Sequence, residues 1–430
     1  MNPAYSFLYR LVRRGTHMAV IRPFAAFRPA KELVQDVAAL PYDVYNRKEA
    51  KAVVEKNPKT FLRIDRPETV HPDDFDMYSD ESYATAKRML DEAMQDGTYV
   101  KEDAPAYYIY ELVMDGRSQT GLVACASIDD YVNEVIKKHE NTREEKEQDR
   151  IRHIDTCDAQ TGPIFLAYRE QPEISVIIRC IQQEEEPLYD WTAEDGVTHR
   201  VWVIDDASDI EALQKEFAAL DQIYIADGHH RAASAVKVGL KRRKEHPDYD
   251  GTEEFNFFLS VLFPDSELAI LPYNRVVKDW NGKSAEDFFA ALSGLGTVEK
   301  AEAPVQPEEK GTVGIYVKDQ WYRFTFADNL RNDDPVEGLD VSLLQNHVLA
   351  PFFAIDDPRT SDRIDFVGGI RGLGELERRV SEDAVIAFSM YPTSIGELFS
   401  VADAGLLMPP KSTWFEPKLR SGIFIHALSE

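Results

Sequence analysis

The sequence predicts an α+β protein of more than one domain. Helical and strand-like segments are mixed along the chain, without the strict strand–helix alternation that produces a doubly wound sheet. No period of 20–50 residues recurs, which excludes a repeat architecture. The chain has 430 residues, of which 43% are hydrophobic. Because it is apolar enough to fold and too long for one ordinary core, we expect two or three domains.

Hydrophobic periodicity and turn signals define the predicted elements. The predicted helices are residues 46–57, 79–96, 210–220, 284–294, 341–350 and 395–405. The predicted strands are residues 106–113, 119–128, 164–169, 174–180, 198–204, 255–263, 268–273, 312–317 and 321–326. Asn46 is a candidate N-cap, Gly97 follows the second helix, and Asp115-Gly116 is typical of a hairpin turn. The densely charged residues 129–156 predict a solvent-exposed helix laced with ion pairs.

The charge balance indicates which classes of partner the protein is unsuited to bind. The formal net charge is −27, and a surface this acidic repels nucleic acid and anionic membranes. The basic run Lys241–Lys244 is expected to be the solvated end of a helix. No window approaches the roughly 18 apolar residues that cross a bilayer. The three cysteines form no CxxC pair, which favours a cytoplasmic location over a disulfide framework. We therefore expect a small-molecule substrate, without a nucleic-acid or membrane partner.

The most informative segment is Ile223–Ala235, a short apolar strand followed by a turn and a helix. Its turn is Asp227-Gly228-His229-His230-Arg231. The start of a helix has unpaired backbone N–H groups and a partial positive charge, so it suits a phosphate. His229, His230 and Arg231 would add donors, and Asp227 is suited to a metal ion or a hydroxyl group. The turn therefore predicts phosphoryl chemistry.

Two other polar segments are candidates for the same site. Glu140, in His139-Glu140, is either a solvent-exposed carboxylate or one that takes a proton from a hydroxyl nucleophile. Lys411, Lys418 and Arg420 form a basic island in an acidic protein. That island either binds an anion or belongs to a C-terminal loop that is held in place by its aromatic residues.

Six motifs are spread over nearly the whole chain. They are Ile21-Arg22-Pro23, Pro41-Tyr42-Asp43-Val44, His139-Glu140-Asn141-Thr142, Asp227–Arg231, Leu271–Arg275 and Pro409–Phe415. Together they resemble the domain-of-unknown-function 1015 family of bacteria and archaea, a resemblance that names a family without an activity. By themselves, Pro41-Tyr42-Asp43 and Pro272–Arg275 are better interpreted as structural turns.

The order of His139-Glu140, Gly162-Pro163-Ile164-Phe165 and Asp227–Arg231 is similar to that in the free serine kinases of the ParB/sulfiredoxin-like superfamily. In those kinases the glutamate is the proposed base on the serine hydroxyl, and the turn holds nucleotide phosphates. The resemblance implies catalytic roles for Glu140, Asp227 and His229, and nucleotide binding by Gly228, His230, Arg231 and His139. A long insertion before the turn departs from the kinases, which have a short hairpin there.

The resemblance implies a ParB/sulfiredoxin-like core of mixed sheet and helices at residues 136–263. Additional α+β regions are expected at residues 18–135 and 264–430, with residues 1–17 as an extension outside the fold. The acidic balance argues against the DNA-binding helices of ParB proteins. Histidine stands where sulfiredoxins have a cysteine, which argues against their chemistry.

The expected activity is phosphoryl transfer to free L-serine, with ATP or ADP as donor and Mg²⁺ as cofactor. Asp227 is the expected Mg²⁺ contact, and Lys411, Lys418 and Arg420 are candidates for binding the serine carboxylate. One alternative is a ParB-like regulatory module that binds or hydrolyses a nucleotide. Another is metal-dependent hydrolysis with His139, Glu140, His229 and His230.

Overall fold

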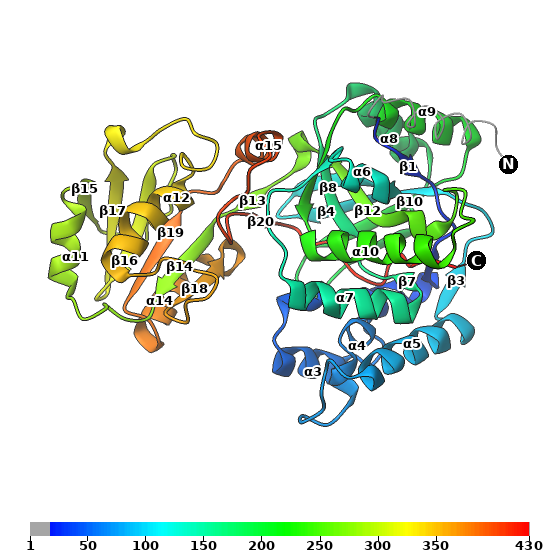
Figure 1. Cartoon of the computed structure of the whole chain (residues 1–430), viewed down its shortest axis with the longest axis horizontal. Helices are drawn as coiled ribbons and strands as arrows, with labels where there is room; N and C mark the ends of the chain where they lie inside the picture. Colours follow the sequence, from blue (N-terminus) through cyan, green and yellow to red (C-terminus); the bar gives the residue numbers. More distant parts are fainter. Residues whose placement is uncertain (1–17, 430) are drawn as a thin grey trace. The chain divides into compact units, whose positions relative to one another are not determined.

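A computed structural model describes residues 18–429 of the chain (Figure 1). The expected extension at residues 1–17 lies outside the described residues. The chain divides into two compact units. Of the described residues, the first unit contains 18–137, Asn141–Leu268 and 417–429, and the second contains Lys138–Glu140 and Ala269–Glu416.

The first unit is built on a nine-stranded mixed sheet, so the α+β class is confirmed. In spatial order its strands are β6 (Ile136–Lys137), β11 (Ile223–Asp227), β8 (Ile164–Tyr168), β12 (Phe257–Pro264), β5 (Arg117–Ser127), β4 (Tyr107–Met114), β10 (Thr198–Ile204) and β9 (Tyr189–Thr192), with β1 (Ile21–Arg22) beside β5. β11 runs parallel to β6, and β12 runs parallel to β8. The other pairs are antiparallel. Strands from both expected regions, 18–135 and 136–263, therefore share one sheet.

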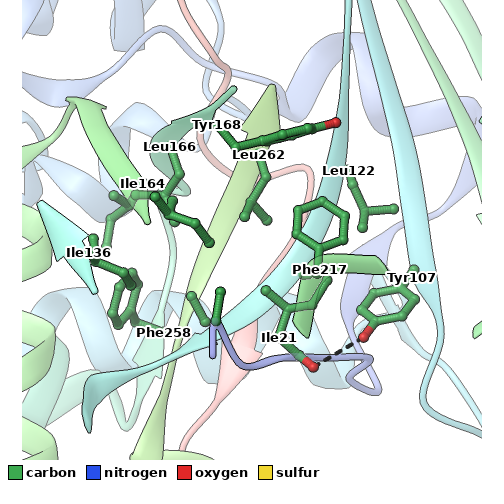
Figure 2. Close-up of a cluster of buried hydrophobic side chains, with 14 of the residues drawn as sticks. Ile21, Tyr107, Leu122, Ile136, Ile164, Leu166, Tyr168, Phe217, Phe258 and Leu262 are labelled. Atoms are coloured by element: carbon green, nitrogen blue, oxygen red, sulfur yellow. Dashed lines mark hydrogen bonds between the residues drawn. The ribbon is translucent and has the colours of Figure 1, made fainter. Parts of the chain in front are cut away.

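The core of this unit lies on the central strands. Every residue of β12 is buried, as expected for a strand covered on both faces. Figure 2 shows Leu262 and Phe258 of β12 among the buried side chains of neighbouring strands and helices. At one edge of this cluster the Tyr107 hydroxyl donates to the Ile21 carbonyl (3.2 Å), which satisfies a polar group within the core.

Several local predictions are confirmed. α3 (Arg47–Lys56) begins at an Asn46 capping box, in which the Asn46 side chain accepts from the Glu49 backbone N–H. α5 (Asp80–Gln95) is followed by Gly97 at φ +86°. β4 and β5 are joined by Asp115-Gly116, both at positive φ, as a type I′ turn requires.

The predicted strand at 174–180 is wrong, because these residues belong to helix α8 (Pro172–Glu184). Ile174, Ile178 and Ile181 lie on one buried face at helical spacing. A short run rich in β-branched residues does not distinguish a buried strand from one face of a helix. Pro172 in the first turn is the signal that favours the helix.

The charged region 129–156 is also less exposed than predicted. It contains α6 (Ile128–Val132), β6 and α7 (Glu144–Cys157). Glu147, Asp149, Arg150 and His153 of α7 are buried. They are accommodated because they bind one another or polar groups of neighbouring elements, such as the bond from Arg150 Nε to Asp149 (2.9 Å).

The basic run Lys241–Lys244 closes α10 (His229–Glu245), which packs beside α7 (Figure 1). The prediction that the side chains of this run are merely solvated is incomplete. Lys241 and Arg242 pair with Asp155, and Arg243 pairs with Asp129 (2.6 Å). Most of this positive charge is therefore neutralised within the first unit.

The second unit contains a six-stranded antiparallel sheet. In spatial order its strands are β15 (Gly296–Ala301), β17 (Gln320–Phe326), β16 (Thr312–Val317), β19 (Ile386–Met390), β14 (Tyr273–Val277) and β18 (Ile364–Gly368). Its main helices are α11 (Ala285–Leu292), α12 (Asp340–Leu344), α13 (Ala350–Phe353), α14 (Gly372–Glu382) and α15 (Ile395–Asp403). The predicted hairpin of residues 312–326 is confirmed as β16 and β17.

The last residues of the chain return to the first unit. Ser421 and Ala39 exchange backbone hydrogen bonds, and β21 (His426–Ala427) pairs with β7 (Ala159–Gln160). Gly422, at φ +81°, packs so closely that a Cβ atom there would lie 2.5 Å from Phe61. This tight docking fixes the path of the segment that carries Lys418. Among the helices of residues 18–429, none has the length and apolar character to span a membrane.

Candidate functional site

The turn between β11 and α10 has the predicted strand–turn–helix form. β11 pairs with β8, and the register shifts between Ile225 and Asp227. A bulge of this kind redirects the side chain that follows it. Gly228 has φ +94°, and a Cβ atom there would lie 2.9 Å from Arg231 Nη2. The left-handed backbone therefore favours glycine, and any side chain here would have to displace the Arg231 guanidinium packed over it.

The start of α10 has the features of an anion-binding site. The helix has 17 residues and no acidic residue in its first turn. The N-cap residue, Gly228, has no side chain to cap the helix, and its own N–H donates to Asp227 Oδ1 (3.0 Å). The first intrahelical hydrogen bond of α10 runs from Ala232 N to Gly228 O (2.9 Å). The N–H groups of the preceding residues therefore have no acceptor within the helix, where the helix dipole is positive.

Asp227 lies beside this helix start with two cations. Lys418 Nζ is 3.2 Å and Arg231 Nη2 is 3.9 Å from Asp227 Oδ2. Burial opposes ionisation of Asp227, but the attraction of Lys418 and Arg231 holds its pKa well below the usual range. The Asp227 side chain is 35% exposed, whereas Lys418 is 12% exposed. The carboxylate is thus ionised, its negative charge is balanced by the neighbouring cations, and it is still partly exposed to solvent.

Arg231 connects the turn to the Gly162-Pro163 motif. Its Nη1 donates to the Pro163 carbonyl. A Cβ atom on Gly162 would lie 3.7 Å from the Arg231 side chain and 3.2 Å from Ser421 Oγ. The two motifs that the kinase resemblance places in order along the chain are therefore adjacent in the first unit.

The two histidines have different environments, as adjacent residues on a helix should. His229 is buried, and its attraction also lowers the pKa of Asp227. His230 is partly exposed, and its Nε2 accepts a hydrogen bond from the backbone N–H of Arg143 (3.0 Å). An accepting Nε2 assigns the proton of the neutral ring to Nδ1.

The segment before α7 is attached to α10 by several polar contacts. Glu147 accepts from Thr142 and from Lys237, and its carbonyl accepts from Ser234 Oγ (3.2 Å). Burial opposes ionisation of Glu147, but the bonds from Lys237 and Thr142 lower its pKa. These contacts keep Arg143 next to His230.

Three predicted site residues belong to the second unit. His139 and Glu140 group with it, and the His139 carbonyl accepts from Met408 N (2.8 Å). Lys411 is exposed, and its Nζ lies 5.6 Å from the centre of the Tyr273 ring. The catalytic role of Glu140, nucleotide binding by His139 and serine binding by Lys411 stay predictions.

Arg420 is only 5% exposed and is engaged away from Asp227. It forms an ion pair with Asp195, and its Nε donates to His199 Nε2 (3.3 Å). Burial and the nearby Arg420 lower the pKa of His199 far below its usual range, so the ring is neutral and can accept this bond. Arg420 therefore anchors the C-terminal segment, and Lys418 is the basic residue of this segment that reaches Asp227.

A small pocket next to Arg231, lined by both apolar and polar side chains, was not predicted. It has a volume of about 30 Å³, and its lining includes Tyr42, Asp65, Arg150, His153, Thr161 and Arg231. Tyr42 comes from the motif interpreted as a structural turn. Asp65 and Thr161 gave no signal of their own, although Thr161 directly precedes Gly162-Pro163. Their proximity depends on contacts between distant segments.

The potential metal-ligating side chains of the described residues do not gather into a metal centre. Within residues 18–429, no three His, Cys, Asp or Glu side chains gather in a way that would hold a metal ion. At Asp227 the Lys418 ammonium takes the place beside the carboxylate that a cation would take. Asp227, paired with Lys418, therefore does not fit a resident metal ion.

Comparisons with known proteins identify the family of the chain. No curated protein matches it. Among solved structures, SbnI with C-terminal truncation from Staphylococcus aureus has 11% identity and a TM-score of 0.36, covering 68% of this chain and 82% of that chain. A free serine kinase (E30A mutant) in complex with AMP has 12% identity and a TM-score of 0.35, with coverages of 69% and 86%. A conserved hypothetical protein from Pyrococcus furiosus has 14% identity and a TM-score of 0.34, with coverages of 70% and 94%.

These identities and TM-scores are too low to assign an activity. The sequence match is more decisive, because it extends over residues 21–342, well over half of the chain. The chain belongs to the family described as protein of unknown function (DUF1015).

Proposed function

We propose that this protein is a nucleotide-dependent phosphotransferase that makes O-phospho-L-serine from free L-serine. The observation that carries the proposal is the turn at Asp227–Arg231. There a left-handed glycine opens a long helix, and Lys418 and Arg231 lie beside an ionised Asp227. A helix start without an acidic first turn, flanked by two cations, favours the binding of a phosphate.

The residues of the first unit have distinct roles in this proposal. The backbone N–H groups at the start of α10 donate hydrogen bonds to phosphate oxygens. Arg231 and Lys418 neutralise negative charge on the phosphate, since a guanidinium and an ammonium next to a developing charge lower the barrier to transfer. His230 donates through Nδ1, while Arg143 fixes the orientation of the ring through Nε2.

The acceptor and the base rest on the resemblance to the free serine kinases. Glu140 takes the proton of the serine hydroxyl, and the serine oxygen forms a bond to the terminal phosphorus of ATP or ADP. The bond between that phosphorus and the bridging oxygen breaks, and the shortened nucleotide leaves with the electron pair. We also propose that the core of the first unit has the ParB/sulfiredoxin-like fold of these kinases.

Mg²⁺, the expected cofactor, would neutralise charge on the phosphates. It is usually held by substrate phosphates and one or two carboxylates. Asp227 is the carboxylate at the turn, where Lys418 is its neighbouring cation. In this proposal the positive charge of the phosphate site comes from Lys418, Arg231 and the helix start, and it does not require a metal ion held by the protein alone.

The test uses the purified full chain with L-serine, Mg²⁺ and either ATP or ADP, and measures phosphoserine by mass spectrometry. Serine-dependent formation of phosphoserine is the expected result. Folded protein that gives no product with either nucleotide would refute the kinase assignment. Nucleotide binding or slow hydrolysis that does not depend on serine would favour the regulatory module instead.

A further inference from the structure

The small pocket next to Arg231 suggests how this side chain is held in place. Its lining residues come from separate segments of the first unit: Asp65 from α4 (Leu62–Asp65), Arg150 from α7, Thr161 from the loop before β8, and Arg231 from α10. Asp65 is 3% exposed. A carboxylate buried this deeply is costly unless other groups compensate its charge.

Asp65 has a specific hydrogen-bond partner. Thr161 Oγ1 donates to Asp65 Oδ1 (2.9 Å) in a fully buried contact. Asp65 also attracts Arg150, whose guanidinium is held by Asp149. Among residues 18–429, neither Arg150 nor Arg231 is in ion-pair contact with Asp65. Any influence of Asp65 on Arg231 would therefore pass through other residues, and Thr161 is the hydrogen-bond partner of Asp65.

Thr161 begins the short segment that contacts Arg231. Its carbonyl accepts from Gly422 N (3.1 Å), so the segment is held from the C-terminal side as well. Two residues later the Pro163 carbonyl accepts from Arg231 Nη1. The restricted φ of Pro163 removes one of the rotations between Thr161 and this carbonyl, so a shift of Thr161 is passed on to the carbonyl more directly.

We propose that Asp65 is a positioning residue that orients Arg231 through Thr161, Gly162 and Pro163. The role rests on the proposed function, in which Arg231 contacts the transferred phosphate. The Arg231 guanidinium lies over Gly228 and 3.9 Å from Asp227. The Pro163 carbonyl accepts from its Nη1, and this hydrogen bond fixes the direction of the guanidinium. Loss of the Asp65–Thr161 bond releases this support and misplaces the guanidinium.

The test compares Thr161→Val, Thr161→Ser, Asp65→Ala and Asp65→Asn. Valine has the shape of threonine without its hydroxyl group, and alanine removes the acceptor. Serine and asparagine retain a donor and an acceptor oxygen. Thr69→Val is the matched control, because Thr69 is also buried and its hydroxyl donates to the Arg66 carbonyl (2.7 Å) and not to Asp65, Thr161 or Pro163.

Two measurements distinguish the outcomes. Crystal structures should show that Thr161→Val and Asp65→Ala lose the Arg231–Pro163 hydrogen bond, whereas Thr161→Ser, Asp65→Asn and Thr69→Val retain it. Calorimetry with ADP and ATP at a temperature where all variants are folded should show at least a tenfold loss of affinity for the first pair only.

An unchanged Arg231 in Thr161→Val would overturn the proposal, whatever the nucleotide result. So would equal nucleotide affinities of wild type and Thr161→Val. If the wild type binds neither ADP nor ATP, the phosphotransferase proposal fails, and the crystal structures still decide whether Asp65 positions Arg231.

Discussion

The Lys418 ammonium lies 3.2 Å from the Asp227 carboxylate, although the two residues are 191 positions apart in the chain. The contact joins the C-terminal segment to the turn that opens α10. It neutralises a carboxylate at a helix start where an anion is expected to bind. Lys418 also lies beyond the residues that match the family, which end at 342.

Replacement of Lys418 by methionine should weaken both folding and phosphate binding. Asp227 would lose the nearer of its two cations, and its pKa would rise toward the ordinary value. The expected loss in the free energy of unfolding is about 1–2 kcal/mol, since a charged hydrogen bond to a partly exposed carboxylate is lost. Urea unfolding and titration with ADP are the measurements.

Lys241→Met is the control for this variant. Lys241 forms an ion pair with Asp155 (2.5 Å) on a more exposed part of α10, where such pairs contribute less than about 1 kcal/mol. We expect little change in stability and none in ADP affinity. Equal effects of the two substitutions would contradict a special role for Lys418.

Gly228→Ala should destabilise the turn. The alanine Cβ would meet the Arg231 guanidinium at 2.9 Å, and the backbone would keep an unfavourable φ of +94°. The expected cost is about 1–3 kcal/mol, with a loss of ADP affinity because Arg231 is displaced. Thermal unfolding and calorimetry measure the two effects.

Gly374→Ala provides the opposite case. Gly374 lies within α14, and apart from its chain neighbours and the adjacent backbone of α14, no described atom is within 4 Å of the position its Cβ would take. Alanine has the higher helix propensity, so this variant should be about 0.5–1 kcal/mol more stable than wild type. A loss of stability comparable to that of Gly228→Ala would show that the steric argument is mistaken.

Asp130 should make stability depend on pH. Its side chain is buried and its Oδ2 accepts from Val20 N (2.7 Å), and burial raises its pKa to about 8. Below the ordinary pKa of 3.8 both the folded and the unfolded state are protonated, and the contribution to stability is fully present. As pH rises toward 8, only the unfolded state ionises, so this contribution is progressively lost.

Asp130→Asn removes this titration. The free energy of unfolding of the variant, measured relative to wild type by urea unfolding, should increase between pH 5 and 8. The slope should approach about 1.4 kcal/mol per pH unit at most. A difference that does not change with pH over this interval would show that Asp130 is ionised in the folded protein.

Glu140→Gln tests the base. If Glu140 takes the serine proton, the substitution should lower kcat for phosphoserine formation by about 10²–10⁴ and leave ADP affinity unchanged. Glu144→Gln is a suitable control, since Glu144 is an exposed glutamate in the first turn of α7. Full activity of Glu140→Gln would remove the residue from the proposed mechanism.

Much of the fold could be predicted because many signals are local. The Asn46 cap, the Asp115-Gly116 turn and the strand–turn–helix at Asp227–Arg231 depend on residues that are near one another in the chain. The strand predicted at 174–180 failed because its isoleucines fit either period, and burial against the sheet selected the helix.

The sequence alone determined the α+β class, the family and a turn suited to phosphate, because periodicity, glycine geometry and motif order are properties of short segments. Only the tertiary structure decided that Lys418 reaches Asp227, that Arg420 pairs with Asp195, and that Asp65 bonds to Thr161. Those pairings join segments far apart in the chain. They form because a charge removed from water must find a partner when the chain becomes compact, and the packing of the sheet and helices determines which partner is near.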